Sequence, residues 1–106
     1  MTTVLERLTK GRERIAHGYS KGDYEKVVCG RQCFCSLGAI GLHIDGTGVA
    51  DQCAVALFNA LPDEWRIVRG PQTLEKQVRV VRFNDHKETK KADVLALFDR
   101  AIASVS

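Results

Sequence analysis

The segment Thr89-Lys-Lys-Ala-Asp-Val-Leu-Ala-Leu-Phe-Asp-Arg-Ala-Ile-Ala-Ser-Val105 has the clearest structural pattern in the chain. Its apolar side chains recur three and four positions apart, which is the spacing of one face of an α-helix. These are Val94, Leu97, Phe98, Ala101, Ile102 and Val105. Asp93, Arg100 and Ser104 fall on the opposite face, and Thr89 is a suitable N-cap. Because a continuous apolar stripe must be covered, the segment predicts a domain built by helix packing.

Three further helices are expected before this one. Thr3 and Glu6 form a capping-box pattern at the start of the first, and Gly18 should end it in the left-handed conformation. The small-residue segment from Phe34 to Gly41 predicts a second helix, and residues 49–60 predict a third. The expected core consists of Leu5, Leu8, Ile15, Leu37, Ile40, Cys53, Leu57, Phe58, Val94, Leu97, Phe98, Ala101 and Ile102.

Only a minor β element is expected, and we place it between the third and fourth helices. Residues 67–69 and 78–83 are its candidate strands, because Val78, Val80 and Val81 are β-branched. The sequence therefore predicts a mainly α, compact single domain over residues 1–106. It should contain about four helices and a small hairpin or a pair of short strands.

Length, charge and cysteine usage narrow the class of protein. A chain of 106 residues with 44% hydrophobic content is long enough for one modest core. Its net charge of +3 is spread along the chain, whereas nucleic-acid surfaces concentrate their cations, so nucleic acid is not an expected partner. No run of about 18 apolar residues and no signal peptide is present, which predicts a cytoplasmic protein without a membrane segment. Its four cysteines are then expected to be reduced thiols, and no cofactor is expected.

One candidate chemistry is a catalytic thiol. Cys35 stands where a helix could begin, and a helix N-terminus lowers the pKa of a thiol. A nucleophile also needs a base and a group that orients the base, and His86 with Asp85 or Asn84 supplies those residue types. The alternative is structural: Asn84 and Asp85 would form a turn before the last helix, bonding to their own backbone.

A second candidate chemistry is a zinc site made by Cys29, Cys33, Cys35 and His17. Structural zinc takes four ligands, and the pattern typical of such sites is a pair of Cys-x-x-Cys motifs, which this sequence lacks. The competing interpretation treats Cys35 and Cys53 as small buried apolar side chains and the other two cysteines as partly exposed thiols. We therefore expect no metal site.

A third candidate is a protein-binding surface around Trp65, Arg66 and Arg69. Tryptophan and arginine are enriched among the residues that dominate binding energy at interfaces. The alternative is that Trp65, which follows a proline that ends a helix, closes one end of the core.

Four motifs, taken in order, resemble a family of small bacterial and phage proteins catalogued only as a domain of unknown function. They are Gly18-Tyr-Ser-Lys-Gly22, Cys35-Ser-Leu-Gly-Ala39, Phe83-Asn-Asp85 and the threonine-capped final helix with its Asp99-Arg-Ala101. Ser36 departs from the family's usual alanine, and Cys29 and Cys33 are additional thiols. The resemblance implies a compact, mostly helical domain and no established activity. It marks Cys35, Gly38, Asn84 and Asp85 as the shared positions.

These shared positions suggest a packing arrangement. Gly38 and Ala39 would admit the turn at residues 83–85, and an amide of that turn would cap the helix that starts near Cys35. For function, the leading expectation is a non-enzymatic protein-interaction module, a phage or prophage accessory factor that binds a host protein. The alternatives are a small thiol-dependent hydrolase or transferase using Cys35, and a zinc-stabilised nucleic-acid-associated protein.

Overall fold

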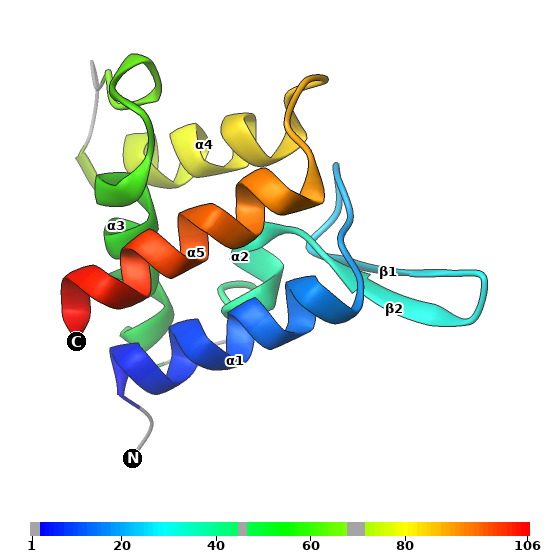
Figure 1. The fold of residues 1–106 in the computed structure, drawn as a ribbon. Helices are drawn as coiled ribbons and strands as arrows, with labels where there is room; N and C mark the ends of the chain where they lie inside the picture. The colour runs from blue at the N-terminus through cyan, green and yellow to red at the C-terminus, as the bar shows by residue number, and fades with distance from the viewer. Residues whose placement is uncertain (1–2, 45–46, 68–71) are drawn as a thin grey trace.

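The helices of this chain surround one shared core, seen in a computed structural model that describes residues 3–44, 47–67 and 72–106 (Figure 1). The elements, in order, are α1 (Val4–His17), β1 (Glu25–Val28), β2 (Arg31–Phe34), α2 (Ser36–Ala39), α3 (Val49–Ala60), the 3₁₀ turn η1 (Asp63–Trp65), α4 (Gln72–Asp85) and α5 (Lys91–Val105). The predicted mainly α class with a minor β element is confirmed. Within the described ranges, no helix is both long enough and apolar enough to cross a bilayer.

Helix α5 is the central element of the packing. It lies against α1 and α3 and runs across the middle of the molecule in Figure 1. Leu97 and Phe98 of α5, Leu8 of α1 and Leu57 of α3 have no solvent exposure. Burying an apolar side chain of this size contributes about 1.5–3 kcal/mol, so this junction supplies much of the stability. Arg12 of α1 also bonds Asp99 of α5, with a Nε–Oδ1 distance of 2.5 Å.

Helix α1 begins as expected and ends differently. The Thr3 hydroxyl accepts a hydrogen bond from the Glu6 amide at 3.1 Å. Gly18, however, is extended, with φ −165°, so the left-handed stop predicted there is wrong. Gly18 is required for close approach instead, because a Cβ at this position would lie 2.5 Å from the Gln32 carbonyl oxygen of β2. Leu5, expected in the core, is 38% exposed.

The β element is a hairpin that follows α1 and projects from the helices (Figure 1). Strands β1 and β2 pair antiparallel, with Val28 opposite Arg31. Cys29 and Gly30 form the two-residue loop, and both have positive φ, at 52° and 77°. The prediction that placed the β element between the third and fourth helices is therefore wrong in position.

Residues 78–83, predicted as a strand, belong to α4. Val80, Phe83 and Asn84 are buried, and their spacing of three and four residues is that of one helical face. Packing of this face against α2 and α3 outweighs the modest β preference of the valines. In the other predicted strand, Ile67 has no strand structure, and residues 68 and 69 lie outside the described residues.

Two helix boundaries also differ from the prediction. Helix α2 has only one turn, Ser36–Ala39, although the sequence indicated a longer element. Helix α5 has Lys90 at its N-cap, one residue after the expected Thr89. There the Asp93 carboxylate accepts from the Lys90 amide at 2.8 Å. The Thr89 side chain is left buried beside the helix start.

Candidate functional site

Asn84 is a fully buried polar side chain in the last turn of α4, not in a loop as the sequence suggested. Its Oδ1 accepts from the Ser36 amide at 2.9 Å and from the Ser36 hydroxyl at 2.7 Å. Its Nδ2 donates to the Ser20 carbonyl at 3.1 Å. Asn84 thus caps the start of α2, which confirms that an amide of residues 83–85 caps the helix near Cys35.

Gly38 has a different neighbour from the one expected. A Cβ on Gly38 would lie 1.8 Å from the carbonyl oxygen of Tyr24. No side chain fits there, because the obstacle is backbone. Gly38 therefore allows the backbone just before β1 to pack closely against α2. The prediction that it makes room for the turn at residues 83–85 is wrong.

Cys35 is buried at the N-cap of α2. Its Sγ accepts from the Gly38 amide at 3.4 Å, which is the role of a capping side chain. Burial raises the pKa of the Cys35 thiol, and the hydrogen bonds from Gly38 and Leu37 offset this only in part. The protonated thiol is therefore the favoured form at neutral pH, whereas a nucleophile requires the thiolate.

The residues proposed to serve Cys35 are divided between two pockets. Cys35 and Asp85 line a pocket of about 350 Å³ that also includes Tyr24 and Val81. His86 lines another pocket, where its Nδ1 accepts from the Glu88 amide at 3.3 Å. Nucleophilic catalysis requires thiol and base within hydrogen-bond reach, and these two line separate hollows.

Hydrogen bonds from residues 19–22 fix the end of α4. The Tyr19 hydroxyl donates to the Asn84 carbonyl, and Lys21 Nζ donates to the His86 carbonyl at 2.5 Å. The Gly22 amide donates to Asp85 Oδ1 at 3.0 Å. Burial, with the nearby Asp85 carboxylate as the next cause, raises the pKa of Tyr19 to about 12. These bonds give Asp85 a structural role.

Of the candidate zinc ligands, Cys29 and Cys33 line one hollow of the hairpin. Cys29 is exposed in the hairpin loop, Cys33 is buried in β2, and His17 ends α1. Among residues 3–44, 47–67 and 72–106, no group of three or more histidine, cysteine or acidic side chains is arranged to hold a metal ion.

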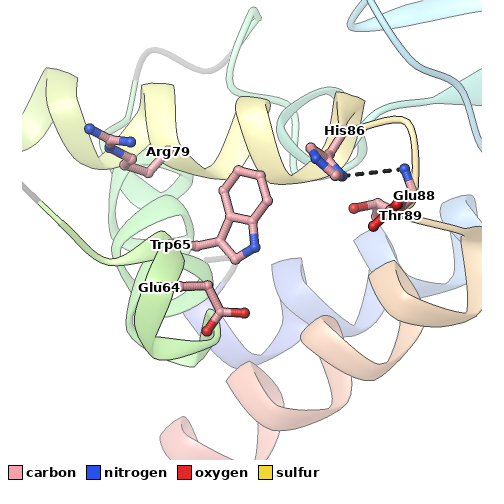
Figure 2. A pocket seen from close by; sticks show the side chains of 6 residues that line it. All are labelled: Glu64, Trp65, Arg79, His86, Glu88 and Thr89. Atoms are coloured by element: carbon pink, nitrogen blue, oxygen red, sulfur yellow. Dashed lines mark hydrogen bonds between the residues drawn. The ribbon is translucent and has the colours of Figure 1, made fainter.

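Trp65 forms one wall of a surface pocket of about 460 Å³ (Figure 2). The indole ring meets Phe83 and His86 edge to face, with centroids 5.6 and 5.2 Å away. The lining residues are Glu64, Trp65, Arg79, His86, Glu88 and Thr89. They come from η1, α4 and the loop before α5, so helix packing creates the pocket. Its volume is within the range of ligand pockets.

The one cation that lines the Trp65 pocket has an ion-pair partner, whereas the two carboxylates that line it have none among the described residues. Arg79 pairs with Glu75 of the same helix, with an NH2–Oε1 distance of 3.2 Å. The exposed Glu64 and Glu88 carboxylates pair with no cation in the described parts of the chain. Figure 2 shows Glu64 beside the indole and Glu88 with Thr89 across the pocket, next to His86.

The sequence identified Trp65 but missed Glu64, Arg79, Glu88 and Thr89. The sequence pattern predicts Thr89 as a helix cap and places Arg79 in a strand. Arg66 bonds Asp63 and donates to the Asn59 carbonyl at 3.1 Å, and it lines a neighbouring hollow. Arg69 lies outside the described residues.

Comparison with known proteins places the chain in a family. The model of the family of unknown function DUF6197 matches residues 1–104, and the chain belongs to that family. No curated protein and no solved structure matches the chain. The expected membership of an uncharacterised family is thereby confirmed.

Proposed function

We propose that this member of a family without assigned activity is a non-enzymatic protein-interaction module. In this proposal it is a phage or prophage accessory factor that binds a host protein. The Trp65 pocket receives a side chain of that partner. The motif resemblance to small bacterial and phage proteins supports a partner from the bacterial host.

The proposal rests on the position of the Trp65 side chain and on its unused hydrogen-bond donor. The side chain is half-buried, packs on the core on one side and lines an open pocket on the other. Its indole N–H makes no hydrogen bond with any described residue. A tryptophan with a fixed ring and an available donor is typical of residues that dominate binding energy. Both sequence interpretations, core closure and binding anchor, are compatible with this position.

The environment of Cys35 supports a non-enzymatic role. Its raised pKa and its capping bond to Gly38 suit a structural thiol. His86, the base that the enzyme hypothesis needs, packs against Trp65 instead.

The proposal is tested by capturing partners from bacterial lysate with the tagged protein and with Trp65→Ala. A retained partner is then purified and its affinity is measured by calorimetry. We expect Trp65→Ala to weaken binding about 30-fold, as for an interface anchor. Val27→Ser, at an exposed hairpin position, is the matched control and should bind normally.

Thermal melting of each variant separates lost binding from lost folding. Trp65→Phe, which keeps an aromatic ring against Phe83, provides a second variant if the alanine form unfolds. An unchanged affinity for every captured partner in a folded Trp65 variant would exclude this pocket as the interaction site.

A further inference from the structure

We infer that the Trp65 pocket accepts a basic side chain, an arginine in first place, from the partner protein. This inference rests on the proposed function and specifies the chemistry of the contact. It follows from the charge, the hydrogen-bonding capacity and the aromatic surface of the pocket, which are independent properties of its lining.

The charge of the lining is the first argument. Glu64 and Glu88 contribute two carboxylates that no described cation neutralises, while the charge of Arg79 is balanced by Glu75. The pocket is therefore acidic, although the whole chain has a net charge of +3. A cationic group gains from both carboxylates, and an anionic group would meet repulsion.

Thr89 is the second argument. Its side chain is only 7% exposed and lines the pocket. Its hydroxyl makes no hydrogen bond with any residue that the structure describes. No buried side-chain polar atom of the described residues lacks a hydrogen-bond partner, so the Thr89 hydroxyl is open to solvent in the pocket, where an N–H of an entering ligand can reach it. The local sequence suits Thr89 as a helix cap, yet Lys90 occupies the cap, and such departures from local rules occur at functional positions.

The aromatic surface is the third argument. Trp65 and His86 meet edge to face, with ring centroids 5.2 Å apart, and both line the pocket. A guanidinium group stacks on an indole face and presents a fork of N–H donors to carboxylates. An arginine side chain therefore matches the indole, the carboxylates and the hydroxyl together.

The single tryptophan of the chain makes the inference directly measurable. We would titrate the folded protein with acetyl-Gly-X-Gly-amide peptides, in which X is Arg, Lys, citrulline, Leu or Glu, and follow the fluorescence of Trp65. The arginine peptide should give a saturable change that weakens as salt rises. Citrulline has the same shape without the charge and should bind at least about threefold more weakly.

Variants then locate the contact. The double variant Glu64→Gln with Glu88→Gln should weaken the arginine peptide by about 3- to 10-fold. Thr89→Val should weaken it without changing the melting temperature by more than a few degrees. The matched control is Glu13→Gln, an exposed carboxylate on α1, which should leave the affinity unchanged.

The outcomes separate this inference from the proposed function. Equal binding of arginine and citrulline peptides, or preferred binding of the leucine or glutamate peptide, would overturn the basic-side-chain inference. It would leave the interaction pocket standing if partner capture still requires Trp65. If no peptide perturbs Trp65, the inference also fails. Loss of the proposed function requires the separate result that a folded Trp65 variant retains every partner.

Discussion

Asn84 uses one side chain to join three segments of the chain. It accepts twice from Ser36 and donates to Ser20, with no exposure to solvent. We predict that Asn84→Ala lowers the free energy of unfolding by about 1–3 kcal/mol, because buried polar partners lose their hydrogen bonds. Urea denaturation measures this change. The exposed Asn59→Ala is the control and should have little effect. An unchanged urea midpoint for Asn84→Ala would show that the hydrogen bonds of Asn84 to the start of α2 do not stabilise the fold.

The half-buried Tyr19 hydroxyl and the buried Cys35 thiol predict how the free energy of unfolding depends on pH. Burial raises the pKa of Tyr19 to about 12 and also raises the pKa of Cys35. In the folded state, these two side chains therefore keep their protons at pH values at which the unfolded chain has already released them. The associated stability is complete below the unfolded pKa values, and for Tyr19 it is lost as pH rises from 10.0 to about 12.

We predict that the unfolding free energy of the wild type falls through this alkaline range, and that the curve of Tyr19→Phe is flatter there. Chemical denaturation at a series of pH values measures both curves. Parallel curves for the two proteins would show that Tyr19 does not contribute to the loss.

At the scale of elements, the hairpin loop offers a stabilising substitution. Cys29 and Gly30 both have positive φ between paired residues Val28 and Arg31. Two-residue loops of this kind prefer Asn-Gly, because asparagine tolerates the left-handed region better than most residues. Cys29→Asn should raise the unfolding free energy by up to about 1 kcal/mol, and Cys29→Val should lower it. Equal midpoints for the two variants would argue against strain at this position.

Helix α4 shows where sequence reasoning fails and why. Its β-branched valines favour a strand locally, yet Val80, Phe83 and Asn84 repeat at helical spacing and all are buried. The polar Asn84 concealed this stripe, because an asparagine on an apolar face is read as a turn. By contrast, α5 has an uninterrupted apolar face, and its assignment from sequence is correct apart from its first residue. Tertiary packing decides between helix and strand when local preference is weak.

The candidate site was only partly predictable for the same reason. Trp65 is recognisable from sequence as a large side chain after a helix-ending proline. Glu88 and Thr89 become its neighbours only because α4 is a helix that brings the following loop toward η1. If α4 is wrongly predicted as a strand, the residues that line the pocket cannot be predicted to lie close together. Cys35 is buried, as expected for a small apolar side chain, whereas Cys33, expected to be partly exposed, is buried as well.

At the scale of the whole molecule, one core joins α1, α3, α4 and α5. The Cα radius of gyration of 12.6 Å is close to the value of about 13 Å typical of a folded 100-residue domain. We predict a single cooperative unfolding transition, in which Trp65 fluorescence and far-ultraviolet circular dichroism coincide. Earlier loss of the Trp65 signal would mean that η1 and its pocket unfold independently of the core.

A ¹H–¹⁵N correlation spectrum of the labelled protein, recorded while an arginine-containing peptide is added, shows directly whether the peptide enters the Trp65 pocket. We expect progressive shifts confined to the amides of residues 64–65, 79 and 86–89 and to the indole N–H of Trp65. Shifts centred on the hairpin or around Cys35, with the indole signal unmoved, would contradict binding of the peptide in the Trp65 pocket.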